Sequence, residues 1–163
     1  SGQVSIFKYT DTFNNGNENL TLKTEVISTN EQINGKKYST VQTSYGSEEN
    51  YTITSTAYMR QLDNGTLVSI DNKDQTEEQI FLNYPLVEGK KWKQTSNAVT
   101  SDITIVTLEG SITTPNKTYT NCLVLQSNME TGKTLTYMQE DIGMVAMTIV
   151  IEKEEKLMIY LLE

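Results

Sequence analysis

Hydrophobic and polar residues alternate with a period of two along much of this chain, which is typical of half-buried β-strands. In residues 51–59 the alternation predicts Tyr51, Ile53, Ala57 and Met59 on one face and threonines on the other. Comparable patterns predict further strands at residues 3–13, 19–29, 37–45, 66–71, 78–83, 99–109, 117–128, 133–139, 144–151 and 156–162.

Turn sequences that contain Asn or Gly separate these strands, at residues 14–17, 34–35, 63–65 and 131–132. Both residue types tolerate the positive φ angles of tight hairpin turns. Consecutive hairpins favour antiparallel pairing of neighbouring strands, and roughly ten strands are too many for a flat sheet. We therefore predict an all-β, mostly antiparallel fold with little helix, in which one curved meander sheet forms a half-barrel, a barrel or a sandwich.

The best candidate for a helix is residues 71–79, but they are nearly all polar and offer no apolar stripe to bury. We therefore predict a solvated loop there. The chain has 163 residues, which fits a single β domain over residues 1–163. A domain of this length buries enough surface to fold without disulfides.

The C-terminal hairpin differs from the other strands because both of its faces are apolar. Strict alternation places Val145 with Met147 on one face and Met144 with Ala146 on the other, and residues 156–162 repeat the pattern. Such strands need cover on two sides, since each large aliphatic side chain left in water forfeits roughly 1.5–3 kcal/mol. The cover is either another segment of this chain, or else a lipid-like ligand or a partner protein.

Acidic residues outnumber basic ones, 21 against 13, and give a formal net charge of −8. This charge repels phosphate backbones, so we expect no nucleic-acid partner. No apolar run approaches the roughly 20 residues that a membrane-spanning helix needs, so we expect no transmembrane segment.

Catalytic chemistry has little to build on, because the chain has no histidine and one cysteine, Cys122. The standard serine triad then has no base, and a Cys-His pair or a mixed Cys/His zinc site cannot form. Acidic pairs such as Glu48-Glu49 and Glu140-Asp141 are typical of solvated turns. We therefore predict that the protein is not an enzyme and has no catalytic residues, no metal site and no cofactor.

A longer motif begins at residues 84–92, which read Tyr-Pro-Leu-Val-Glu-Gly-Lys-Lys-Trp. It resembles a segment of secreted or lipid-anchored bacterial β domains of unknown function, and the sheet is also similar to lipoprotein-carrier half-barrels. The resemblance covers residues 84–147 through Thr114-Pro115, residues 119–123, Tyr137 and residues 143–145. The sequence departs from it at residues 138–141, where Met-Gln-Glu-Asp replaces an Ala-Pro-Gly-like turn.

The resemblance implies a turn at Gly89 and a strand that begins at Trp92. It also implies export from a bacterial cell, to the extracellular space, the cell surface or the periplasm, and a lipid-modified cysteine upstream of Ser1. It brings no catalytic residues.

Five residues are candidates for ligand contact: Trp92, Tyr137, Met144, Met158 and Tyr160. Aromatic rings stack on sugars and other planar ligands, and Trp92 is the first choice because Gly89 places it near a loop. The late methionines suit an adaptable apolar pocket. Packing within the core is the simpler explanation for each. The methionine cluster consists of Met138, Met144, Met147 and Met158.

The main hypothesis is a non-enzymatic, exported bacterial binding or structural domain at the cell envelope. Its partner would be an unknown protein or a small hydrophobic or carbohydrate ligand. The alternative is a carrier of a lipid or lipoprotein in a hydrophobic half-barrel, with the C-terminal hairpin forming part of the lining.

Overall fold

In the computed structural model of this chain, the described residues form twelve β-strands in one antiparallel sheet. The structure describes residues 2–10, 20–47, 50–96, 99–129 and 132–162. No helix occurs within these ranges, so the predicted all-β antiparallel fold is confirmed. The strands are β1 (Val4–Tyr9), β2 (Leu20–Ile33), β3 (Lys36–Ser47), β4 (Asn50–Gln61), β5 (Leu67–Ile70), β6 (Gln79–Leu82), β7 (Lys91–Ser96), β8 (Val99–Thr113), β9 (Thr118–Met129), β10 (Gly132–Gln139), β11 (Gly143–Ile151) and β12 (Glu154–Leu161).

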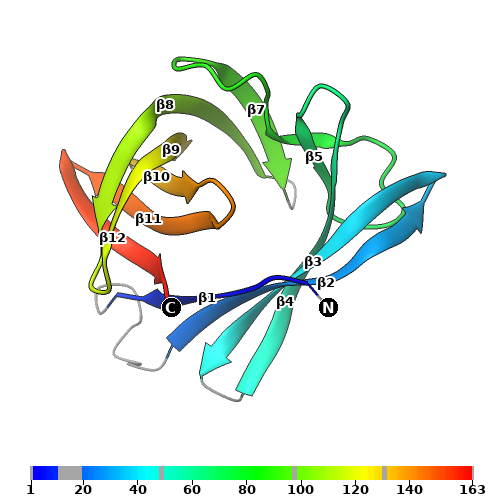
Figure 1. Cartoon of the computed structure of the whole chain (residues 1–163), viewed down its shortest axis with the longest axis horizontal. Helices are drawn as coiled ribbons and strands as arrows, with labels where there is room; N and C mark the ends of the chain where they lie inside the picture. The colour runs from blue at the N-terminus through cyan, green and yellow to red at the C-terminus, as the bar shows by residue number, and fades with distance from the viewer. Residues whose placement is uncertain (1, 11–19, 48–49, 97–98, 130–131, 163) are drawn as a thin grey trace.

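The order of strands in the sheet is β6-β5-β4-β3-β2-β1-β12-β11-β10-β9-β8-β7, so all neighbours but one are consecutive in sequence. The exception joins the two ends of the chain, where Phe7 of β1 pairs with Leu161 of β12. The sheet curls into a nearly closed barrel whose two edges are β6 and β7 (Figure 1). Of the three predicted shapes, the structure therefore selects the barrel, and the twist between successive strands explains the curl.

The tight turns follow the predicted chemistry in part. Asn34 and Gly35, with φ of 50° and 75°, connect β2 to β3, and Gly65, with φ of 89°, lies between β4 and β5. The β11–β12 turn uses Glu152 and Lys153, with φ of 49° and 74°, although neither residue favours this conformation. Features outside the described residues are the predicted turn at residues 14–17, the end of the first predicted strand at residues 11–13, Thr131 and the Glu48-Glu49 pair.

A β-bulge in β4 reverses the predicted faces of that strand. Ser55 pairs with Thr43 of β3, whereas Ile53, two residues earlier, pairs with the adjacent Ser44, so one residue of β4 is extra. Because Thr43 and Ser44 point to opposite faces of β3, Ile53 and Ser55 do so as well. The prediction that residues 51 and 53 share a face with residues 57 and 59 is therefore wrong.

A second bulge corrects the prediction for the C-terminal hairpin. Adjacent residues of β10 pair with Ala146 and Met144, which leaves Val145 as an extra residue of β11. Val145 and Ala146 are both 0% exposed in one cluster, and Met144 and Met147 line one cavity. Strict alternation put Val145 with Met147 and Met144 with Ala146, and this is wrong because the bulge shifts the pattern by one residue.

One side of β9–β12, which we call the core face, carries Val124, Tyr137, Ala146 and Tyr160 as successive cross-strand partners. Their exposed fractions are 3%, 7%, 0% and 8%. The β8–β9 hairpin covers this face, since its Tyr119 belongs to the same buried cluster. The same chain therefore supplies the cover that this side of the C-terminal hairpin needs.

Edge strand β6 is anchored by Glu78, the residue that precedes it. The Arg60 guanidinium of β4 donates to both carboxylate oxygens of Glu78, at 2.5 and 2.8 Å, and the Tyr38 hydroxyl of β3 donates at 2.5 Å. The Arg60 hydrogen bonds lower the pKa of Glu78 to about 2. The anchor holds β6, including Phe81, against the sheet.

Candidate functional site

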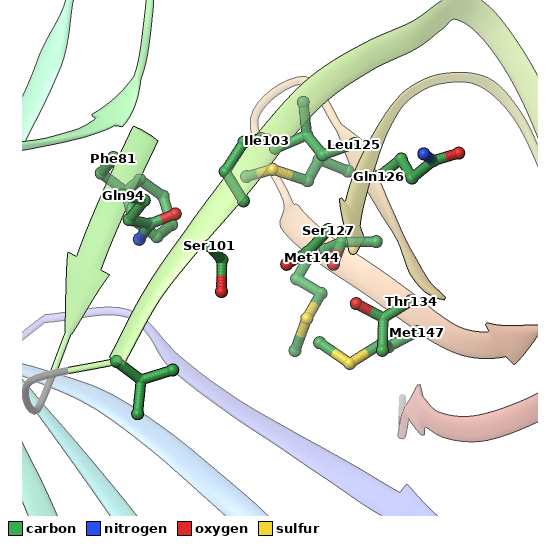
Figure 2. A pocket seen from close by; sticks show the side chains of 13 residues that line it. Phe81, Gln94, Ser101, Ile103, Leu125, Gln126, Ser127, Thr134, Met144 and Met147 are labelled. Atoms are coloured by element: carbon green, nitrogen blue, oxygen red, sulfur yellow. The ribbon is translucent and has the colours of Figure 1, made fainter. Parts of the chain in front are cut away.

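A cavity of about 400 Å³, the first cavity, is lined mainly by β8–β11 and reaches both sheet edges. Phe81 of β6 and Gln94 of β7 both line it, and Figure 2 shows the side chains around it. Its volume falls in the range of roughly 300–1,000 Å³ that is usual for ligand pockets. The lining consists of Phe81, Gln94, Val99, Ser101, Ile103, Leu125, Gln126, Ser127, Thr134, Thr136, Met138, Met144 and Met147.

The pairing of β8–β11 explains why these side chains converge. Leu125 of β9 pairs with Thr136 of β10, which pairs in turn with Met147 of β11. Ser127 of β9 and Thr134 of β10 form the next pair on the same side of the sheet, two residues further along. Directly paired residues point to the same side of a sheet. We call this side the cavity face.

The chemistry of the first cavity is mainly apolar and entirely uncharged. Met138, Met144 and Met147 contribute thioethers, and the polar members are Gln, Ser and Thr side chains. None of the described lining residues carries a charge. Methionine side chains repack around ligands of different shape, so this wall suits a hydrophobic ligand better than an ionic one.

A second cavity, of about 580 Å³, lies beside the β10–β11 turn. Its polar members include the Glu140 and Asp141 carboxylates of that turn, both on exposed residues. Met138 lines this cavity as well as the first one. The lining consists of Gln3, Leu67, Leu82, Tyr84, Leu86, Leu108, Asn121, Leu123, Met138, Gln139, Glu140, Asp141, Ile142 and Gly143.

Of the five predicted site residues, Met144 lines the first cavity. Met158 is half-buried and does not line either cavity. It is an extra residue of a bulge in β12, because its neighbours Leu157 and Ile159 pair with the adjacent residues Thr148 and Met147. The structure does not bring Met158 and Met144 together in one site.

The three aromatic candidates are buried. Trp92, 8% exposed, packs with Leu82 and Ile105 and borders a hollow beside Lys91 and Lys93. Tyr137 and Tyr160 lie on the core face, away from both cavity linings.

Tyr137 also has a polar partner. Its hydroxyl donates to the Glu155 carboxylate at 2.9 Å, and Thr148 donates to the same oxygen at 2.7 Å. Burial, together with this carboxylate, raises the pKa of Tyr137 to about 12. The hydroxyl is therefore engaged within the protein.

Sequence reasoning did not single out most of the lining. Phe81, Leu125 and Thr136 belong to ordinary strand patterns, and nothing local marks them as cavity residues. Met138 and Met147 had a signal, because they belong to the late methionine cluster. That cluster supplies three of the lining side chains.

The single cysteine, Cys122, lines neither cavity. Cys122 is 0% exposed, and burial raises the pKa of its thiol, which disfavours the reactive thiolate. Among the described residues, no group of three or more Cys, Asp or Glu side chains is placed to hold a metal ion. Among the residues that the structure describes, no helix is long enough and apolar enough to cross a bilayer.

Comparisons with known proteins add no relative. No family model, no curated protein and no solved structure matches this chain. The resemblance of residues 84–147 to exported bacterial β domains therefore stays a prediction. The geometry of the cavities carries the functional argument.

Proposed function

We propose that this chain is a non-enzymatic binding domain whose first cavity takes a small, uncharged and mainly hydrophobic ligand. The observation that carries the proposal is the uncharged lining, in which Leu125, Ile103 and three methionines surround a volume of about 400 Å³. Apolar surface gains roughly 25 cal/mol for each Å² removed from water. A charged ligand would lose its hydration and find no opposite charge in this lining.

Binding, and not turnover, fits the functional groups of the lining. The Ser101, Ser127, Thr134 and Thr136 hydroxyls have no titratable side chain beside them within the lining to act as a base. The Gln94 amide gives a ligand a neutral hydrogen-bond partner, whereas the Gln126 amide is already bonded to Lys133 and Asn128. These groups orient a ligand but do not activate it.

A carrier of lipid is a second candidate function, and the position of the first cavity favours it. The cavity reaches both edges through Phe81 of β6 and Gln94 of β7, and the described residues of these two strands form no ladder of paired residues with each other. A flexible hydrophobic cargo can enter through such a seam without breaking a β-ladder. In either case we propose export from a bacterial cell, which rests on the resemblance of residues 84–147.

The test of binding uses the uncharged dye N-phenylnaphthylamine, whose fluorescence rises in apolar surroundings. Thr136 is half-buried on the cavity face, so Thr136→Phe would fill the first cavity. We expect this variant to bind the dye about tenfold more weakly, a change of about 1.4 kcal/mol. Thr52→Phe is the matched control, because Thr52 is exposed on β4 and lines neither cavity.

Equal dye affinity in the wild-type protein and the Thr136→Phe variant would contradict the proposal, provided that both unfold cooperatively. The carrier function has a separate test. Organic extraction of the purified protein, followed by mass spectrometry, should recover lipid from the wild type and less from Thr136→Phe. Binding of the dye without any recovered lipid supports the binding domain and contradicts the carrier.

A further inference from the structure

The two cavities follow one another along the same strands. On β9, Ser127 and Leu125 line the first cavity, and Leu123 and Asn121 line the second. Ser127, Leu125 and Leu123 are spaced by two, so in an extended strand they point to the same side, whereas Asn121 has a φ of 55° at an irregularity of the β8–β9 pairing. On β6, Phe81 lines the first cavity and the adjacent Leu82 lines the second.

Strands β10 and β11 also contribute residues to both cavities. Thr134 and Thr136 line the first cavity, Gln139 lines the second, and Met138 between them lines both. On β11, Met144 belongs to the first cavity and the preceding Gly143 to the second.

Met138 is the residue at which the cavities meet. Its cross-strand partners are Leu123, which lines the second cavity, and Met144, which lines the first. Its side chain is half-buried and packs against the cluster that contains Leu82 and Leu125. An unbranched thioether side chain changes rotamer at low cost, so it can leave this position without disrupting the sheet.

We infer that the two cavities form one binding channel, which opens when the Met138 side chain moves, and that the ligand is a long-chain amphiphile. The inference rests on the proposed function and deepens it. The stretch of β9 from Asn121 to Ser127 sets the length of the channel at about 20 Å, at about 3.3 Å for each residue of a strand. The chain of the ligand lies past Met138, in both cavities.

The polar end of the amphiphile lies at the second cavity. This end carries the amides of Gln3, Asn121 and Gln139 and the exposed carboxylates of Glu140 and Asp141, whereas the lining of the first cavity has no charge. A hydroxyl head group finds hydrogen-bond partners there, and an anionic head group meets two like charges. The ligand is therefore a long-chain lipid whose head group is not anionic.

The experiment measures displacement of the dye from the intact chain by octanol and by hexadecanol. Octanol is short enough for one cavity, and hexadecanol needs both. Leu108→Trp fills the second cavity from a side chain that is 37% exposed, so the fold should tolerate it. Met138→Phe replaces the movable thioether with a rigid ring at the junction.

We expect each variant to lose about tenfold in hexadecanol affinity. Octanol affinity should stay within about twofold in Leu108→Trp, because Leu108 does not line the first cavity, whereas Met138→Phe also changes the wall of the first cavity. Leu108→Ala, which opens the second cavity instead of filling it, is the control and should retain the preference for the long chain. Palmitate should displace the dye less well than hexadecanol.

The outcomes separate the two proposals. Failure of octanol and of hexadecanol to displace the dye overturns the proposed function. Displacement by both, with the long-chain preference intact in Leu108→Trp and in Met138→Phe, leaves the first cavity as the whole site and overturns the single channel. If Met138→Phe does not fold, as judged by cooperative unfolding in urea, the Leu108→Trp variant decides between these results.

Discussion

Two neighbouring rows of paired residues cross strands β9–β12 side by side and differ in their access to the first cavity. One row, Val124, Tyr137, Ala146 and Tyr160, lies on the core face and is at most 8% exposed. The other row, Leu125, Thr136, Met147 and Ile159, starts one residue further along β9 and includes three residues that line the first cavity.

The difference lies in what each row packs against. Aromatic rings fill the core face, and the β8–β9 hairpin closes it with Tyr119. On the cavity face, Thr136 is small and Met147 is flexible, so this side retains an open volume. One sheet thus separates side chains that stabilise the fold from side chains that can receive a ligand.

The largest expected effect comes from removing a core-face ring. Tyr119 is 2% exposed, so Tyr119→Ala should cost about 3–5 kcal/mol of unfolding free energy, measured in urea. Its hydroxyl has no hydrogen-bond partner among the described residues, so Tyr119→Phe should be close to neutral. If Tyr119→Ala lowered the unfolding free energy by no more than truncation of a cavity-face methionine does, the proposed difference between the core face and the cavity face would be contradicted.

A pH titration sharpens the comparison at Tyr137. The pKa of this residue is about 12 in the folded protein against an ordinary value of 10.0, so the folded state holds the proton more tightly. The corresponding stability is complete below pH 10 and is lost as the pH rises toward 12. Tyr137→Phe should remove this part of the alkaline loss, whereas Tyr45→Phe, at an exposed residue, should keep it.

Truncation on the cavity face should affect binding more than stability. Met147 is half-buried, so Met147→Ala should cost about 1 kcal/mol, well below a fully buried methionine. The dye should bind the variant about threefold to tenfold more weakly, because the lost thioether removes part of the wall. A large loss of stability with unchanged dye binding would place Met147 in the core instead.

The smallest perturbation tests access to the two faces directly. Cys122 lies on the core side at 0% exposure, so its thiol should react with iodoacetamide only after unfolding. In a Cys122→Ser background, a cysteine introduced by Met144→Cys should react in the folded state, and the dye should slow the reaction. Equal rates at the two positions would contradict the division between the faces.

Much of the fold was predictable because its signals are local. Alternation located most of the strands, and Asn34-Gly35 located a turn, since the preference for positive φ belongs to the residues themselves. The Glu152-Lys153 turn was harder to predict, because Glu and Lys do not favour the positive φ angles that both residues adopt there. Strand β7 runs where only the resemblance predicted a strand start.

The candidate site was predictable only in part. The methionine cluster pointed to Met138, Met144 and Met147, which the structure places around one volume. Trp92 carried the most conspicuous side chain and is packed in a buried cluster. A side chain's chemistry indicates what it can bind, whereas its access to a ligand depends on residues far away in sequence.

The sequence by itself determined an acidic, antiparallel β chain without histidine. Only the tertiary structure decided which side of each strand is closed, where the sheet edges meet and that a cavity reaches them. The physical reason is that side-chain direction reverses with each residue, so a single bulge, such as the one at Val145, exchanges the two faces. Whether a bulge forms depends on the partner strand, and the sequence of one strand does not contain that information.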